Sequence, residues 1–364
     1  MSEPVMWRTP FGRVVETSRT PISSSRSPLA RTLSLCSVLS VLLFTVTPAQ
    51  AQSATEPGVR YAIESQKAAS TLQLDIAHAG NRLVAVGDRG HILYSDDAGT
   101  SWTQAKVPTR QLLTAVTFAD DKHGWAVGHD ALILATSDGG QTWTRQYEDR
   151  EGEVPLLDVW FENAQHGLAT GAYGVLLETT DGGQNWEDVA GRLDNEDGTH
   201  LNAIAEIPGS GVFIVGEMGG MFRSADMGET WERVDSPYQG SFFGVVGGGE
   251  PGVVVAFGLR GNLFRSTDFG DTWQAIELRD ENDPLETGLA DGNLLSDGRV
   301  VVVGHGGTVL SSDDKGQTFS LFSRPDRRSL SGVVANADGN LVLVGQSGVR
   351  VVTPTGANLP VKQQ

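Results

Sequence analysis

The chain has 364 residues, of which 39% are hydrophobic, and its 45 acidic residues outnumber 27 lysines and arginines to give a net charge of −18. This length is sufficient for one large domain or two ordinary ones. A surface this acidic repels nucleic-acid phosphates and anionic lipid headgroups, which argues against both as partners.

The first 51 residues have the pattern of a secretory signal that is removed on export. Arg26 and Arg31 precede an apolar run, Leu33–Val46, and a small-residue cleavage site, Ala49–Ala51, follows it. The run is short for a membrane span, so we predict cleavage after Ala51 rather than an uncleaved anchor. The mature protein is then expected in the periplasm, or in the thylakoid lumen of a photosynthetic source, without direct insertion into a membrane.

Removal of the signal changes the composition of the mature chain. Five arginines and two glutamates are lost with residues 1–51, which leaves a net charge of −21. The single cysteine, Cys36, is lost as well. An exported chain without cysteine forms no disulfide and has no thiol chemistry, so packing has to supply its stability.

Seven similar units follow, and each contains a glycine-rich turn between two apolar stretches. The leading glycines of these turns recur 41 to 46 residues apart. A period in the forties with strand-like content is typical of a β-propeller, in which each repeat forms one blade. The leading glycines are Gly87, Gly128, Gly171, Gly216, Gly258, Gly304 and Gly345.

Each unit is interpreted as four strands, A to D. In the first unit, strand A is the short run Leu74–Ala77, and strand B is the apolar stretch Arg82–Gly87. Strand C follows the turn, at Gly90–Ser95, and strand D begins at an aromatic residue, at Trp102–Pro108. The continuous apolar runs of strand B are typical of strands buried on both faces between blades.

Six units place a polar octet between strands C and D, the first of which is SDDAGTSW, Ser95–Trp102. We expect its Ser and Asp side chains to accept hydrogen bonds from the turn, its Gly to be left-handed and its Trp to pack between blades. A catalytic carboxylate does not come in six equivalent copies, so we assign the octets to the fold. The residues in this structural set are Asp97, Gly99, Trp102, Asp138, Gly140, Trp143, Asp181, Gly183, Trp186, Asp226, Gly228, Trp231, Asp268, Gly270, Trp273, Asp314, Gly316 and Phe319.

The seventh unit ends without an octet, because the chain reads TPTGANLPVKQQ after Val352 and then stops. We therefore predict that Gly58–Glu64 supplies the fourth strand of the last blade, because Val59, Tyr61 and Ile63 alternate with Arg60, Ala62 and Glu64 as in a half-buried edge strand. Such closure removes a free sheet edge. The predicted boundaries are a signal at 1–51, a linker at 52–57, an all-β, seven-bladed propeller at 58–358 and a tail at 359–364.

The octet and the hairpin before it form the Asp-box pattern of bacterial-neuraminidase (BNR) repeats. With HGWAVG at His123–Gly128 and SDGGQTW at Ser137–Trp143, the chain resembles the photosystem II stability/assembly factor family over about Leu72–Thr353. The resemblance implies an exported, non-catalytic propeller that binds a protein and assists assembly of a membrane complex. In a non-photosynthetic bacterium it implies an accessory protein of an envelope complex such as an exporter. Asp boxes also occur in sialidases, other glycosidases and sorting receptors.

The strand order places the B–C turns and the long, charged D–A loops on one face of a propeller, around the channel mouth. Long loops gathered on one face of a scaffold indicate function. The B–C turns differ from blade to blade and include aromatic, Met and Arg side chains, the types that anchor protein interfaces. We predict that a protein partner, a membrane-complex subunit, docks over this mouth. The candidate partner-binding residues are Arg89, His129, Tyr173, Met218, Arg260 and His305.

The alternative is a glycosidase, a sialidase-like hydrolase or a glycan-binding module at the same mouth. Asp88, Asp130 and Glu217 would approach one another there as the carboxylate pair that glycoside hydrolysis needs, although solvated turn residues are the simpler interpretation. No histidines have metal-site spacing, and Asp194–Gly198 misses the spacing of a calcium loop. We expect no catalytic residues, no metal, no cofactor and a monomer.

Overall fold

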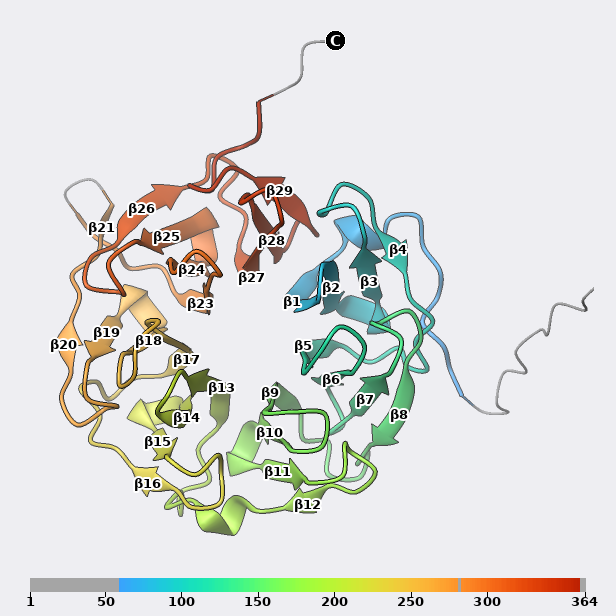
Figure 1. Ribbon diagram of the computed structural model, residues 1–364, viewed down its shortest axis with the longest axis horizontal. Coiled ribbons are helices and arrows are strands. Elements are labelled where there is room, and N and C mark those ends of the chain that lie inside the picture. The colour runs from blue at the N-terminus through green and yellow to red at the C-terminus, as the bar shows by residue number, and fades with distance from the viewer. Residues whose placement is uncertain (1–58, 281–282, 361–364) are drawn as a thin grey trace, which may run out of the picture. The chain divides into compact units, whose positions relative to one another are not determined.

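A computed structural model of the chain describes residues 59–280 and 283–360, which form a ring of seven β-sheets around a central opening (Figure 1). The helical elements of these residues are short 3-10 turns. The prediction of an all-β, seven-bladed propeller is confirmed. The red seventh blade lies beside the blue first blade in Figure 1, so the two ends of the repeat array meet.

The first four blades each contain four antiparallel strands, with strand A innermost. Their strands are β1 (Gln73–Ala79), β2 (Arg82–Gly87), β3 (Ile92–Ser95), β4 (Thr103–Gln104), β5 (Leu113–Phe118), β6 (Gly124–Gly128), β7 (Ile133–Thr136), β8 (Thr144–Tyr147), β9 (Leu156–Phe161), β10 (Gly167–Gly171), β11 (Leu176–Thr179), β12 (Glu187–Asp188), β13 (Leu201–Ile207), β14 (Gly211–Gly216), β15 (Met221–Ser224) and β16 (Glu232–Arg233).

The fifth and sixth blades have four strands, and the seventh has three. A small separate hairpin, β21–β22, interrupts the connection between blades five and six. The remaining strands are β17 (Phe242–Gly247), β18 (Val254–Gly258), β19 (Leu263–Ser266), β20 (Gln274–Ala275), β21 (Arg279–Asp280), β22 (Asp283–Pro284), β23 (Leu289–Leu294), β24 (Val300–Gly304), β25 (Thr308–Ser312), β26 (Ser320–Ser323), β27 (Leu330–Ala335), β28 (Leu341–Gly345) and β29 (Arg350–Val352).

The hydrophobic core is divided among the interfaces between blades. Strand B is buried along nearly its whole length in every blade, as the apolar runs predict. The interface of blades one and two shows the arrangement: Val84 of β2 and Ala126 of β6 pack with Trp143, the aromatic residue of the second octet. Each blade therefore depends on its neighbour to bury its apolar face.

Local hydrogen bonds hold each octet. In the first, Ser95 Oγ donates to Asp97 Oδ1 at 2.8 Å and accepts the amide of Gly99 at 2.9 Å. Asp97 also accepts the amide and the hydroxyl of Ser101, at 2.8 and 2.6 Å. Trp102 Nε1 donates to Gly99 O at 3.1 Å. Equivalent carboxylate bonds recur at Asp138, Asp181, Asp226, Asp268 and Asp314.

The predicted closure by Gly58–Glu64 is wrong for the described residues of that segment, 59–64. They form no strand, and they lie against the first blade, where Ala62 N donates to Val107 O at 2.9 Å. The alternation that suggested an edge strand breaks down at its centre, although Val59 and Tyr61 are half-buried as expected. Ala62 packs into the core between blades one and two, whereas Ile63 is 62% exposed.

The ring closes instead through residues immediately before and within β1. Val349 N donates to Ala69 O at 3.0 Å, and Ser331 Oγ of β27 donates to Gln73 O at 2.8 Å. In blade two, Ala131 N donates in the same way to Val154 O, which precedes the next strand A. The segment around Ala69 therefore serves as the end of a D–A loop for the seventh blade.

The C-terminal segment forms a turn that resembles an Asp box without its carboxylate. Thr353 Oγ1 lies 3.0 Å from Thr355 Oγ1 and accepts the amide of Ala357 at 3.0 Å, which are the contacts that box serines make. The chain then returns along β29 through one antiparallel bridge, Val352–Asn358. The seventh blade thus begins a fourth strand from its own sequence.

The buried side chain of Arg324, in the loop after β26, stabilises this turn through hydrogen bonds. It is 2% exposed, and it donates to Gly356 O at 2.6 Å and to Asn358 Oδ1 at 2.9 Å. The donation to a turn carbonyl parallels the bond from Trp102 to its box glycine. Arg324 therefore compensates for the tryptophan that the seventh unit lacks.

Two faces follow from the strand order. The mouth face carries the B–C turns and D–A loops, and the box face carries the A–B turns and Asp boxes. The predicted signal, its cleavage site and the linker lie outside the described residues. Within residues 59–280 and 283–360, no helix has the length and apolar character needed to cross a membrane.

Candidate functional site

All six candidate partner-binding residues are exposed on the B–C turns of the mouth face. Five of the turns are single 3-10 turns, and the second residue of each has a left-handed backbone. The turns are η2 (Asp88–Gly90), η3 (Ala172–Gly174), η5 (Glu217–Gly219), η6 (Leu259–Gly261) and η7 (His305–Gly307).

Four of the candidates share the left-handed position. The φ angles of Arg89, Tyr173, Met218 and Arg260 lie between 51° and 59°. In the sixth blade the same position is taken by Gly306, with φ 66°, for which this conformation has no steric cost. A non-glycine residue there is strained by about 1 kcal/mol or more.

The two histidines occupy a different position from the other four candidates. His129 and His305 are the first residues of their turns, so the six side chains do not form one equivalent set. In blade two the left-handed residues are Asp130 and Ala131. Among the described residues, no hydrogen bond or ring contact joins two of the six candidates, which are distributed around the mouth.

The largest exposed apolar side chains of the mouth lie on consecutive blades. Tyr173 is 68% and Met218 70% exposed, and Leu259 of the next blade is 40% exposed. The Tyr173 ring meets His200 edge-on at 5.0 Å, and His200 Nδ1 lies 3.6 Å from Glu217 Oε1. Blades three to five therefore present a row of exposed apolar side chains, and its tyrosine packs against His200, which in turn contacts Glu217.

An arginine pocket on the mouth side of blades one and two was missed by sequence reasoning. It has a volume of about 490 Å³ and is lined by Arg60, Arg110, Arg145 and Arg150 with Thr109 and Gln111. Glu148 pairs with two of these arginines, at 2.9 Å each. The four arginines come from the segment before the first blade, from strand β8 and from two successive D–A loops, so no single stretch of sequence signals the pocket.

The acids considered for glycoside hydrolysis are each engaged locally. Asp88 pairs with its neighbour Arg89 at 3.2 Å, Asp130 accepts a hydrogen bond from Gln111, and Glu217 contacts His200. Within the described part of the chain, no three His, Cys, Asp or Glu side chains gather in a group that would hold a metal ion.

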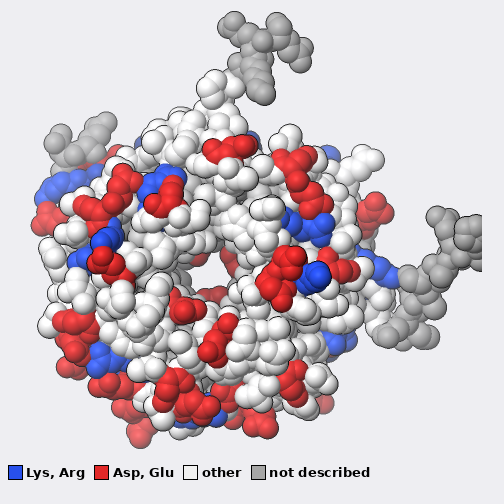
Figure 2. All heavy atoms as spheres, viewed as in Figure 1, with Lys and Arg blue, Asp and Glu red and all other residues white. Residues whose placement is uncertain are grey.

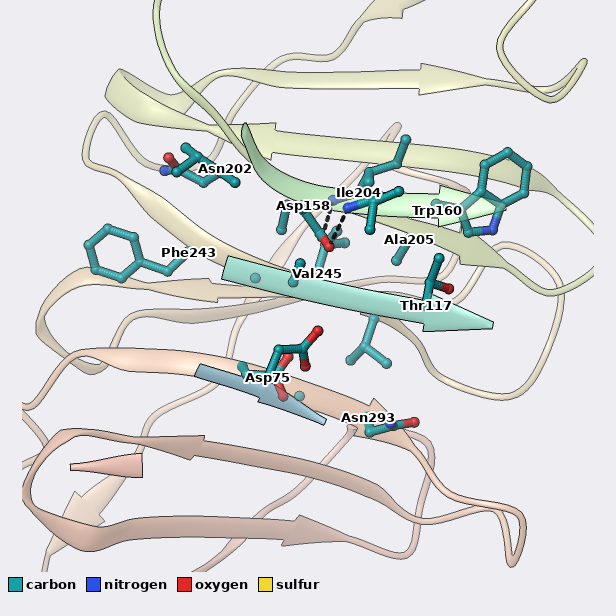
Figure 3. A pocket seen from close by; sticks show the side chains of 18 of the residues that line it. Asp75, Thr117, Asp158, Trp160, Asn202, Ile204, Ala205, Phe243, Val245 and Asn293 are labelled. Atoms are coloured by element: carbon teal, nitrogen blue, oxygen red, sulfur yellow. Dashed lines mark hydrogen bonds between the residues drawn. The ribbon is translucent and has the colours of Figure 1, made fainter. Parts of the chain in front are cut away.

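The central channel contains a second feature that sequence reasoning did not single out. The channel has a volume of about 520 Å³ and is lined by residues of the innermost strands (Figure 3). Asp75, Asp158 and Asp291 lie in it, on β1, β9 and β23. Burial raises the pKa of Asp75 to about 6 and that of Asp158 to about 7, and it raises the pKa of Asp291 well above its ordinary value.

Acidic side chains dominate the charged surface of the face drawn in Figure 2, where they spread over the rim and also border the central opening. This distribution agrees with the net charge of −18. Against that background, the four arginines of the pocket are an exception.

Comparison with known proteins gives one family. A family model described as photosynthesis system II assembly factor YCF48 matches residues 95–155 and 149–281. The chloroplast photosystem II stability/assembly factor HCF136 of Cyanidioschyzon merolae is 44% identical over 61 residues, 16% of this chain and 14% of that protein. The photosystem II assembly protein Ycf48 of a Synechococcus strain is 36% identical over 141 residues, 37% of this chain and 41% of that protein. The matches thus span less than half of these relatives' lengths.

Solved structures agree on the fold. A structure of YCF48 bound to D1 peptide is 20% identical and superposes with a TM-score of 0.60 over 78% of this chain and 94% of that chain. Virginiamycin B lyase from Staphylococcus aureus is 10% identical, with a TM-score of 0.64 over 80% of this chain and 97% of that chain. At these identities the likeness extends to the propeller fold and not to activity.

Proposed function

The chain belongs to the photosynthesis system II assembly factor YCF48 family, and from that premise we propose that it is an exported, non-catalytic propeller that binds a protein subunit of a membrane complex through its mouth face. In a photosynthetic source the complex is photosystem II. In a non-photosynthetic bacterium it is an envelope complex such as an exporter.

The observation that carries this proposal is the strain in four turns. Arg89, Tyr173, Met218 and Arg260 hold left-handed backbones, and all four side chains are exposed. Long side chains at such positions add strain without contributing to the core, and strained residues with exposed side chains cluster at binding sites. Tyr, Met and Arg are also the types that anchor protein interfaces.

The arginine pocket supplies a second, charged contact for a partner. Guanidinium groups bind carboxylates through paired hydrogen bonds, and Arg145 and Arg150 already pair with Glu148. The other arginines of the pocket, Arg60 and Arg110, suit an acidic segment or a chain terminus of a partner. YCF48 has been solved with D1 peptide, which supports the proposal that this chain also binds a peptide segment. An acidic partner segment would be attracted to this pocket and repelled by the acidic remainder of the surface.

The test replaces the four strained residues with glycine. The variant Arg89→Gly, Tyr173→Gly, Met218→Gly and Arg260→Gly should lose capture of the membrane-complex subunit that the wild type retains from solubilised membranes. Its melting temperature should change little, because relief of strain offsets the greater freedom that glycine gives the unfolded chain.

The matched control is glycine substitution on the box face. Ala98→Gly and Lys315→Gly alter residues with the same backbone conformation, at φ 58° and 63°, and should leave capture intact. If the mouth variant captures the subunit at full strength, the mouth is not the binding surface. A parallel variant, Arg110→Gln with Arg150→Gln, separates the contribution of the arginine pocket.

Export is the second component of the proposal. Relatives include proteins named photosystem II assembly lipoprotein Ycf48 from Synechococcus and Prochlorococcus strains, names that agree with an exported protein. We propose a mature N-terminus at Gln52, in the periplasm or thylakoid lumen. The intact mass of the purified protein tests this, and a species that retains Cys36 would contradict it.

A second candidate function is a glycoside hydrolase or glycan-binding module. It is favoured by carboxyls with a raised pKa in a cavity, which is a property of general acids. Asp75 and Asp158 are, however, already bonded to backbone amides of two blades each. A crystal soak that showed a sugar between two of these carboxyls would favour this candidate over the first.

A further inference from the structure

The three channel aspartates occupy one equivalent position in different blades. Every strand A begins with an irregularity in its pairing with strand B, and six of the seven residues that follow this bulge line the channel. Four blades have a small residue there, and three have an aspartate. In blade order the residues are Asp75, Ala115, Asp158, Ala203, Gly244, Asp291 and Gly332.

Each aspartate bonds to the innermost strand of the following blade. Asp75 accepts the amide of Val116 at 2.7 Å. Asp158 accepts the amide of Ile204 at 2.9 Å, a bond drawn as a dashed line in Figure 3. Asp291 accepts the amide of Val333 at 3.2 Å. The carboxyls thus join blades one to two, three to four and six to seven.

In each of these interblade bonds, the donor amide belongs to a residue that follows a small residue. The residue directly before the donor amide is Ala115, Ala203 or Gly332. A blade that receives a carboxyl therefore has a small residue at the equivalent position of its own strand. At three separate interfaces, an aspartate in one blade is followed by a small residue at the same position in the next blade. This repetition indicates that the pairing is a feature of the fold and not a coincidence.

Among the described residues, no lysine or arginine lines the channel to neutralise these acids. The seven innermost strands contain only two other titratable side chains, His78 and Glu206, and no lysine or arginine. Both are exposed and lie toward the box-face end of their strands. Desolvation by neighbouring atoms lowers the pKa of the His78 ring below its ordinary value of 6.5, so this side chain is uncharged at neutral pH.

Burial and mutual repulsion therefore act together on the three carboxyls. Burial raises the pKa of Asp158, and the charge of Asp75 raises it further. Burial also raises the pKa of Asp291, with added contributions from Asp75 and Asp158. The amide hydrogen bonds act in the opposite direction but do not outweigh burial.

We propose that the channel is a proton-sensitive lock: the ring is most stable when the carboxyls of Asp75, Asp158 and Asp291, which join neighbouring blades, carry protons, and it loosens when all three are ionised. The lock depends on the ring itself and not on any partner. It tightens when the surroundings become acidic and relaxes as the pH rises through neutrality.

The direction of the effect follows from proton linkage. The folded protein holds these protons more tightly than the unfolded chain, whose aspartates have the ordinary pKa of 3.8. The stabilisation is present in full below that value and is lost as the pH rises through the folded values. The relevant range therefore extends from about pH 4 to above pH 7.

The test compares melting temperatures of the wild type and of Asp75→Asn, Asp158→Asn and Asp291→Asn, each between pH 4.5 and 8.5. Asparagine keeps the shape and has no charge at any pH. The melting temperature of the wild type minus that of each variant should fall by several degrees across the range. Use of the difference removes the contributions of other titrating groups.

The matched control is Asp268→Asn in an Asp box. Bonds from Thr272 lower the pKa of Asp268 despite the opposing effect of burial, so it is ionised in both states above pH 5. The melting temperature of the wild type minus that of this control variant should stay constant over the same pH range. Flat or rising curves for all three channel variants would overturn the proposal.

A measurement on the unmodified protein covers the case in which a variant does not fold. With aspartate labelled with ¹³C at Cγ, three carboxyl resonances should titrate near or above pH 6, well separated from those of the boxes. If every aspartate resonance titrates below pH 5, the channel is permanently ionised and the lock does not exist.

Discussion

The aspartates of the boxes and those of the channel differ in what surrounds the carboxyl. In the boxes the oxygens accept several local hydrogen bonds at an exposed turn, and the bonds led by the Ser101 hydroxyl lower the pKa of Asp97 to about 2. In the channel, burial among seven strands raises the pKa of Asp158 to about 7. One residue type thus serves opposite electrostatic roles in the same chain.

The box aromatic residue is the side chain with the largest expected effect on stability. Trp143 is 4% exposed, packs edge-on against Phe118 at 6.2 Å and donates to Gly140 O at 3.0 Å. Trp143→Ala should lower the free energy of unfolding by about 3–5 kcal/mol, measured by urea denaturation. Thr144→Ala, at the exposed neighbouring position, should change it by about 0.5 kcal/mol or less. Equal effects would show that the tryptophan is not an interblade anchor.

At the scale of elements, the last blade shows how a repeat array ends. Its fourth strand is reduced to a single bridge, and Arg324 holds the turn before it in place of a tryptophan. Residues 59–64, which were expected to complete this blade, lie on the first blade instead. The junction between the first and last blades therefore relies on loop contacts, such as that from Val349 to Ala69, as well as on sheet packing.

The role assigned to Arg324 leads to a prediction for the loop after β26. Arg324→Leu should lower the free energy of unfolding by about 2–3 kcal/mol, because Gly356 O and Asn358 lose a buried donor. Arg328→Leu, four residues along the same loop and exposed, should have an effect of about 0.5 kcal/mol or less. Thermal or urea unfolding distinguishes the two, and similar values for both variants would contradict the role of Arg324.

At the scale of the whole molecule, we expect the Asp boxes to contribute to the acid limit of stability. The pKa of Asp97, Asp226 and Asp314 is lowered from 3.8 to about 2 by hydrogen bonds in the folded state. Such groups stabilise the fold above pH 3.8, and this stabilisation is lost as the pH falls through their folded values. The free energy of unfolding should therefore drop steeply between about pH 4 and pH 2.

Urea unfolding at a series of acidic pH values measures this drop. The triple variant Asp97→Asn, Asp226→Asn and Asp314→Asn should show a shallower dependence on pH over the same interval, since asparagine does not titrate. A dependence as steep as that of the wild type would mean that other carboxyls cause the acid unfolding. The channel aspartates act in the opposite direction and at higher pH.

The propeller and its seven blades could be predicted from the sequence alone because the signals are local. Each box is held by bonds between residues two to four positions apart, so the same short pattern folds in the same way six times. The exposure of the B–C turns also follows from strand order. The closure, the arginine pocket and the channel lock depend on contacts such as that of Asp75 with Val116, 41 residues away. Only the curvature of the complete ring brings such residues together, and no local pattern encodes which blade edge an isolated segment such as 59–64 will join.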